Sequence, residues 1–201
     1  MFYFNLKKFN FYIFFFVFFF FLIPTKNIFG LDSKHLQEIE NYLNKLKFIS
    51  SEFIQSSSDG YQAEGKIFLS KPGKLRIEYK EKENLLIIAD GKWLHYYDIE
   101  LNEIQSVIIE KSPAWFLLKK KLNFKKDFNI KQFKKNSGKT TISLTNDKLE
   151  NVKKITLIFA SKPIELKKWI ILDFQDIETT VSLLNIKEEK SFNKKTFSLI
   201  K

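Results

Sequence analysis

The sequence predicts a mainly β protein with helices, built as a strongly curved antiparallel sheet or incomplete β-barrel whose helices cover the concave face. Three observations predict this fold. From residue 48 onward apolar and polar residues alternate with a period of two, short turn sequences interrupt the alternation, and only two stretches have a helical pattern. Many short strands joined by tight turns favour consecutive antiparallel hairpins.

The first thirty residues differ from the rest. Lys7 and Lys8 precede an unbroken apolar run of 13 residues, 11–23, which Pro24 ends. A basic segment followed by a short apolar run is typical of a secretory signal peptide. As a helix this run would be about 20 Å long, which is too short to span the hydrocarbon core of a membrane, about 30 Å thick. We expect residues 1–30 to be a cleavable signal peptide and residues 31–201 to form a single domain. The alternative is an uncleaved anchor that tethers the domain to the inner membrane.

One longer helix is expected at the start of the domain, over residues 33–47. Leu36, Ile39, Leu43 and Leu46 recur at steps of three and four, which places them on one helix face. This face should pack against the sheet.

Strands with one apolar face follow this helix. Asp90-Gly91 predicts a two-residue type I′ turn between two strands that are apolar on both faces, so both faces need cover. Strands are expected from Phe48 onward, at 63–69, 75–79, 85–89, 92–97, 128–133, 140–145, 155–160, 168–173 and 180–186, with a last one at 196–200.

A short buried helix is expected over residues 114–118. Ser112 can cap it and Pro113 suits the first helical position. The segment that follows is apolar almost all round, so it must be covered on every side.

The sequence carries no sign of catalysis. The chain has no cysteine, two histidines, no G-x-S-x-G nucleophile turn and no phosphate-binding glycine loop, so we expect no enzyme, no metal site and no cofactor. The net charge of +11 raises the question of nucleic acid. However, Arg76 is the single arginine, and arginine makes the bidentate phosphate and base contacts. A solvated lysine surface, weakly attracted to anionic headgroups or an acidic partner, is the better interpretation.

Several segments resemble the LolA family of periplasmic outer-membrane lipoprotein carriers, in the family's order. Residues 65–79 are similar to its G-x-hydrophobic run that ends in basic-Pro-x-x-hydrophobic, and residues 88–98 are similar to its D-G-K turn and aromatic strand. Residues 113–118 resemble its lid helix, and Gln55 suits its early strand. The resemblance covers about residues 33–197.

The resemblance implies a periplasmic carrier for acylated lipoproteins. Such a carrier accepts cargo from an inner-membrane ABC-type releasing complex and delivers it to an outer-membrane receptor, or to the outer membrane directly. The receptor of this fold is itself a lipoprotein and needs an N-terminal cysteine, so the absence of cysteine favours a soluble carrier, expected to be a monomer. The alternative is a periplasmic lipid or small hydrophobic ligand-binding or sensor protein of the same open-barrel fold. An enzyme acting on envelope lipids is a third hypothesis, which the missing motifs disfavour.

The resemblance also assigns residues. Lys71 stands where the family often has an arginine latch for the lid, and a lysine has no planar fork, so we expect weaker closure. Arg76 alternates with Leu75 and Ile77, so it should point outward. The chain also stops soon after Phe197, a departure from the family that suggests a shortened terminal strand or loop. The expected lid is Trp115, Phe116, Leu117 and Leu118, and the expected acyl-chain site is Ile67, Leu69, Leu75, Ile77, Tyr79, Leu94 and Tyr96.

Overall fold

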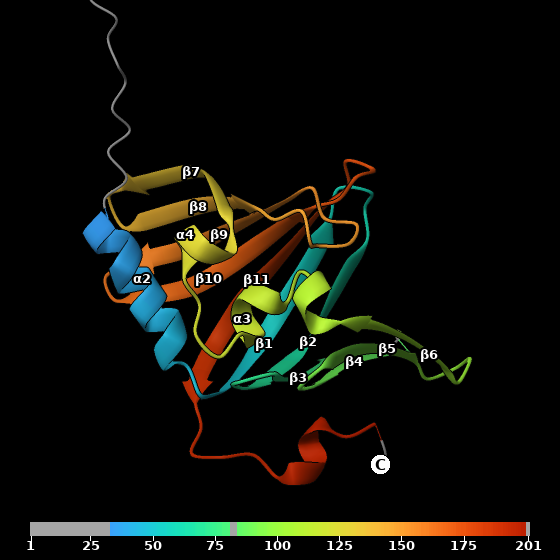
Figure 1. Ribbon diagram of the computed structural model, residues 1–201. Helices are drawn as coiled ribbons and strands as arrows, with labels where there is room; N and C mark the ends of the chain where they lie inside the picture. Colours follow the sequence, from blue (N-terminus) through green and yellow to red (C-terminus); the bar gives the residue numbers. More distant parts are fainter. Residues whose placement is uncertain (1–32, 81–83, 200–201) are drawn as a thin grey trace, which may run out of the picture. The chain divides into compact units, whose positions relative to one another are not determined.

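Eleven strands and five short helices make up the described part of the chain. The computed structural model describes residues 33–80 and 84–199 (Figure 1). The predicted signal peptide lies outside these residues. The helices are α2 (Ser33–Lys45), η2 (Ile109–Lys111), α3 (Trp115–Leu118), α4 (Phe124–Asp127) and η3 (Lys194–Phe197). The strands are β1 (Phe48–Ser57), β2 (Gln62–Ser70), β3 (Lys74–Tyr79), β4 (Leu85–Asp90), β5 (Trp93–Asp98), β6 (Glu103–Ile108), β7 (Asn129–Asn136), β8 (Lys139–Thr145), β9 (Lys154–Ser161), β10 (Ile164–Leu172) and β11 (Glu178–Glu188).

All eleven strands belong to one antiparallel sheet in the order β6-β5-β4-β3-β2-β1-β11-β10-β9-β8-β7. The pairing of β1 with β11 joins an N-terminal and a C-terminal half in the middle of the sheet. The sheet does not close, because β6 and β7 are its two edges. It bends around the side that carries α2, α3 and α4 (Figure 1). The predicted class, an open curved sheet with helices on its concave face, is confirmed.

Helix α2 packs through the predicted face. Leu36, Ile39 and Leu43 are at most 1% exposed. The helix is also anchored by polar groups, since Nε2 of His35 lies 2.8 Å from Oγ1 of the fully buried Thr140 in β8. It ends at Lys45, two residues before the predicted end, because β1 begins at residue 48. None of the helices in the described ranges is long and apolar enough to cross a membrane.

Three local predictions are wrong. The loop between β4 and β5 is Gly91-Lys92 rather than Asp90-Gly91, and only Gly91 has a positive φ, which is the pattern of a type II′ turn. Ser112 does not cap α3, because its hydroxyl donates to the carbonyl oxygen of Ile109. The predicted last strand at 196–200 is instead the 3-10 helix η3 over residues 194–197.

Candidate functional site

A cavity of about 260 Å³ lies between α3 and the concave face of the sheet. Strands from both halves of the sheet contribute to its wall, and the segment leading into α3 closes one side. The lining is mostly aliphatic and aromatic: Gln55, Ile67, Leu75, Ile77, Tyr79, Ile87, Leu94, Tyr96, Pro113, Ala114, Phe116, Leu117, Trp169, Ile171, Asp173, Ile177, Thr179 and Val181.

Six of the seven predicted acyl-chain residues line this cavity, namely Ile67, Leu75, Ile77, Tyr79, Leu94 and Tyr96. They are brought together by register: Ile67 is opposite Ile77, which is opposite Ile87, and Ile87 is opposite Tyr96. Directly opposed residues of neighbouring strands share a face, so one row of apolar side chains crosses four strands. The seventh residue, Leu69, is 2% exposed and does not line the cavity.

The predicted lid divides into two sides. Phe116 and Leu117 line the cavity, and the Phe116 ring stands at 67° to the ring of Trp169, with 6.1 Å between centroids. Trp115 lies outside the cavity lining, where its ring contacts Phe128 at 5.3 Å and the Lys119 ammonium at 4.6 Å. Leu118 is buried but also does not line the cavity.

The end of α3, the predicted lid, is hydrogen-bonded to the turn between β2 and β3. The N–H of Gly73 donates to the carbonyl oxygen of Leu118 at 2.9 Å. The predicted latch, Lys71, is two residues away, but its Nζ donates to the carbonyl oxygen of Leu43 in α2, also at 2.9 Å. A cation at the C-terminal end of a helix is favourable, because unpaired carbonyl groups lie there. Burial lowers the pKa of Lys71 to about 8. The charge is thus placed on α2 rather than on α3.

Helix α2 also supports the segment that follows the lid. The side chain of Asn44 accepts from the N–H of Leu122 at 2.8 Å and donates to its carbonyl oxygen at 2.9 Å. Glu40 accepts from the N–H of Phe124 at 2.7 Å. The C-terminal end of α3 and the segment after it are therefore held by polar contacts, while α3 itself is a single turn.

Few polar groups reach the cavity. The hydroxyl of Tyr79 donates to Oε1 of Gln55 at 3.1 Å, and burial raises the pKa of Tyr96. Asp173 accepts from the N–H of Gln175 and of Ile177, so its carboxylate is occupied by the β10–β11 turn. Within the described residues no group of three or more His, Asp or Glu side chains could hold a metal ion. The arrangement can bind an apolar chain and offers polar partners at only a few points.

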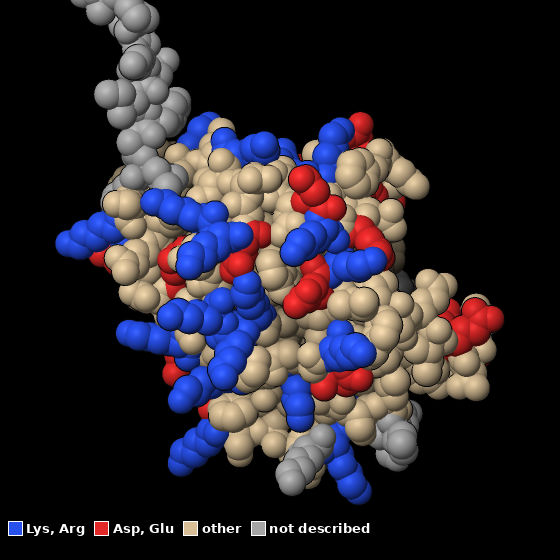
Figure 2. Space-filling view, viewed as in Figure 1, with Lys and Arg blue, Asp and Glu red and all other residues tan. Residues whose placement is uncertain are grey.

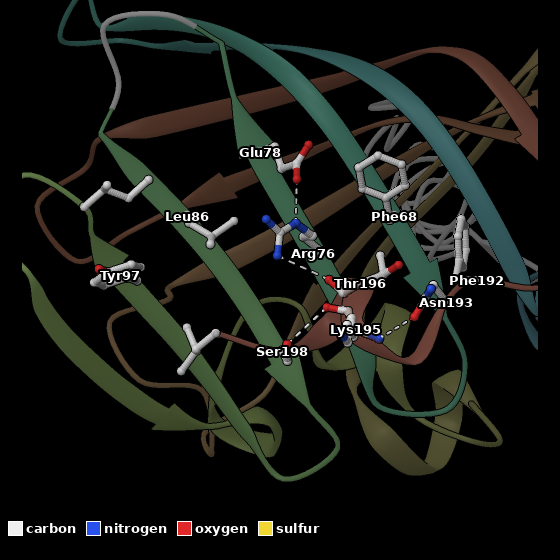
Figure 3. Close-up of a pocket in the computed structure, with 12 residues that line it drawn as sticks. Phe68, Arg76, Glu78, Leu86, Tyr97, Phe192, Asn193, Lys195, Thr196 and Ser198 are labelled. Atoms are coloured by element: carbon white, nitrogen blue, oxygen red, sulfur yellow. Dashed lines mark hydrogen bonds and ion pairs between the residues drawn. The ribbon is translucent and has the colours of Figure 1, made fainter. Parts of the chain in front are cut away.

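The opposite face of the sheet carries a second groove, of about 670 Å³, next to the C-terminal segment (Figure 3). Arg76 points into it and away from the cavity, as predicted, but it is covered rather than free in solvent. Its Nε donates to Glu78 at 2.6 Å and its Nη1 to the carbonyl oxygen of Thr196 at 3.3 Å. Phe192 packs beside Phe68 with 5.9 Å between ring centroids. The strands β4 and β5 were expected to need cover on both faces. On this face the cover is η3 and the residues before it.

Comparison with known proteins decides the family. A family model described as outer membrane lipoprotein carrier protein LolA matches residues 44–200. This chain belongs to the LolA family. An outer-membrane lipoprotein carrier protein of Wigglesworthia glossinidia brevipalpis is 30% identical over 166 residues, which cover 79% of this chain and 75% of that protein. An uncharacterised protein of Rickettsia prowazekii is 26% identical over 156 residues, which cover 78% and 73%.

Solved structures share the fold at much lower identity. A DUF1329 family protein from Desulfovibrio piger superposes with a TM-score of 0.51 at 8% identity, covering 83% of this chain and 97% of that one. An uncharacterised protein from Thermus thermophilus gives the same TM-score at 8% identity, with coverage of 82% and 91%. The open sheet of this LolA-family chain is thus a shared fold.

Sequence reasoning missed the part of the cavity wall that β10, β11 and the turn between them supply. Trp169 and Ile171 of β10 line the cavity, as do Ile177, Thr179 and Val181 in and before β11. Their spacing of two was a usable signal for a shared face. The residues that resemble LolA-family motifs most clearly, 65–98, lie in β2 to β5, so the resemblance assigns no role to β10 and β11.

Proposed function

We propose that this chain carries acylated proteins through the periplasm and holds their acyl chains in the cavity beneath α3. The observation that carries this proposal is the row of apolar side chains crossing β2 to β5 under Phe116 and Leu117. Membership of the LolA family supports it, because relatives in that family are named outer-membrane lipoprotein carrier proteins.

Movement of the lid is part of the proposal. A cavity of about 260 Å³ is slightly smaller than the pockets of about 300–1,000 Å³ that take drug-sized ligands. Phe116 and Leu117 fill the adjoining space, so an entering chain displaces them. Burial gains about 0.8 kcal/mol per methylene, so a 14-carbon tail gains on the order of 10 kcal/mol. Exposing two large apolar side chains costs about 1.5–3 kcal/mol each, which offsets part of that gain and keeps release feasible.

The proposed route begins and ends at membranes. Residues 1–30 act as the signal peptide that exports the chain, and residues 31–201 act as the carrier domain. An inner-membrane ABC-type complex loads the acylated lipoprotein, and an outer-membrane receptor, or the outer membrane itself, receives it. The carrier works as a monomer without enzymatic activity, since binding and release of an apolar chain need no bond to form or break.

A release assay tests the proposal. Purified mature protein is added to spheroplasts, and the soluble fraction is examined for an outer-membrane-type lipoprotein bound to it. We expect release by the natural chain and by Lys74→Glu, which changes an exposed residue of β3, but not by Ile77→Glu, which places a charge in the cavity. Mass spectrometry of co-purifying molecules distinguishes the alternative: a free lipid or glycolipid in place of lipoprotein would assign a lipid-binding or sensor role.

A further inference from the structure

The two edges of the sheet differ in how they are protected. Edge β7 carries Lys131, Lys134 and Lys135, and its register with β8 shifts between Ile130 and Gln132. Lysines and bulges are the devices by which an edge strand avoids pairing with another chain. Edge β6, residues 103–108, pairs with β5 without a register shift and has Glu103 as its one charged residue. It is therefore open to a further strand.

The main-chain groups available on β6 follow from its pairing. The N–H of Ile109 donates to the carbonyl oxygen of Lys92 at 3.0 Å. Because antiparallel pairs alternate between bonded and non-bonded positions, residues 103, 105 and 107 also direct their backbone groups toward β5. The backbone groups of Ile104, Ser106 and Ile108 point the other way, to the free edge.

Edge β6 is also close to the acyl cavity. Val107 is opposite Leu94 and Gln105 is opposite Tyr96, and both of these β5 residues line the cavity. Opposed side chains share a face, so β6 continues the cavity side of the sheet by one strand. The chain then runs through η2 to Pro113 and Ala114, which line the cavity at the start of the lid.

The peptide groups next to the acyl chains of a bound lipoprotein need hydrogen-bond partners, and edge β6 can supply them. The acyl chains of the lipoprotein enter the cavity, but its polypeptide cannot follow, because peptide groups without hydrogen-bond partners are costly in an apolar site. The residues next to the acyl group therefore lie at the rim, where their N–H and carbonyl groups need partners. A strand added beside β6 would lie about 5 Å from it and within two strand spacings of β5.

We propose that β6 binds the residues that follow the acylated end of the cargo, as an added β-strand. This inference rests on the proposed carrier function and names a second contact for the same cargo. Added strands gain affinity from main-chain hydrogen bonds, so one edge can accept many sequences. A carrier with several cargoes needs such tolerance.

The charge near β6 sets a preference among peptides. Asp98, Glu100 and Glu103 surround the tip of the β5–β6 hairpin, and acidic atoms gather at the right edge of Figure 2, where that hairpin projects. Lysines dominate the surface over α2 and α4 in the same view. Edge β6 thus favours a segment that is uncharged or basic. Two exposed apolar residues add contact area: Ile104, 51% exposed, on the face of β6 opposite the cavity, and Leu101, 65% exposed, in the turn before it.

Three lipopeptides test the strand. Each has an N-terminal diacylated cysteine followed by about eight uncharged residues and a lysine, the length of an ordinary strand. One is unmodified, and the other two carry N-methyl groups on alternate amides, in the odd or the even positions. Because the acyl anchor fixes the register, only one of the methylated isomers loses the hydrogen bonds to β6. We expect that isomer alone to bind about tenfold more weakly.

Two variants link the effect to β6. Ser106→Pro removes one outward N–H and leaves the pairing with β5 intact, a position where edge strands tolerate proline. Ser106→Ala is its control, because it loses only the hydroxyl contact to Nδ1 of His95. We expect Ser106→Pro to reduce the difference between the two methylated isomers and Ser106→Ala to keep it. Hydrogen exchange at residues 104, 106 and 108 should slow with the unmodified lipopeptide.

The outcomes separate the two proposals. Equal binding of all three lipopeptides to the natural chain overturns the strand proposal and leaves the carrier proposal standing, whether or not Ser106→Pro folds. No binding of any lipopeptide overturns the carrier proposal, and the strand proposal with it. A dimer that forms without lipopeptide and that Ser106→Pro dissociates, seen by sedimentation, assigns the edge to a second copy and also overturns the proposal.

Discussion

The N–H of Gly73 donates to the carbonyl oxygen of Leu118, which fastens the last residue of α3 to the β2–β3 turn. Gly73 has a φ of +78°, and a Cβ there would lie 2.8 Å from the Cα of Gly91 in the β4–β5 turn. The end of the lid and two hairpin turns therefore meet at a point where a side chain does not fit.

Substitution of Gly73 by alanine should loosen the lid. The left-handed backbone alone costs about 1–2 kcal/mol for a residue with a Cβ, and the contact with Gly91 adds about 1–3 kcal/mol. Gly60→Ala is the matched control, because its φ is +98° and no atom lies within 4 Å of the added Cβ. Urea denaturation should show the larger loss for Gly73→Ala, with faster hydrogen exchange of the Leu118 amide. Equal losses in the two variants would argue against the contact.

Removal of the Phe116 side chain should lower the stability of the protein and raise its affinity for an acyl chain. Phe116 is 2% exposed and fills space beside Trp169, so Phe116→Ala should cost about 3–5 kcal/mol of unfolding free energy. The space left is apolar and suits a hydrocarbon chain, so a fluorescent fatty-acyl probe should bind more tightly.

Trp115→Ala is the control for this prediction. Trp115 belongs to the same turn of helix but packs against Phe128 outside the cavity. It should lose stability without a gain in probe affinity. If both variants gain affinity equally, general loosening of the lid explains the effect and Phe116 has no special role as a plug.

The apolar row under the lid could be predicted, whereas the orientation of the lid could not. Leu75, Ile77 and Tyr79 alternate with polar residues, and a period of two assigns a face without further information. In contrast, α3 is four residues long and apolar throughout, so no periodicity distinguishes Phe116 from Trp115. Only packing against the sheet directs one ring into the cavity and the other away from it.

Strand β6 was not predicted, and the C-terminal segment was predicted as the wrong type of element. Strand β6 was missed because an exposed edge strand has no buried face, so its residues show little alternation. The C-terminal segment was predicted as a strand, but it is bound across the sheet face through Thr196 to Arg76 and through the buried Phe197. Such tertiary contacts override local β-propensity.

The stability of the protein should depend on pH through Lys71. Burial lowers its pKa to about 8, against 10.5 for the free side chain. Between these values the unfolded chain holds a proton that the folded chain has released, so the free energy of unfolding rises with pH, by at most about 1.4 kcal/mol per pH unit. Burial raises the pKa values of Tyr42 and Tyr96, which oppose this trend at higher pH, so the useful window is about pH 8–10.

Lys71→Met isolates this contribution. Urea denaturation of both proteins across the window should show the natural chain gaining stability relative to the variant as pH rises. Parallel curves would mean that the Lys71 ammonium is solvated rather than buried, so that its pKa is the same in the folded and the unfolded chain.

Cross-linking from the two faces of β3 tests the acyl cavity most directly. A photoreactive amino acid is placed at Ile77, which lines the cavity, or at Arg76, which faces the C-terminal segment, and each protein is irradiated with a radiolabelled diacyl lipopeptide. We predict that position 77 captures the acyl chains and position 76 does not. Labelling at position 76 instead, or equal labelling at both positions, would contradict the account.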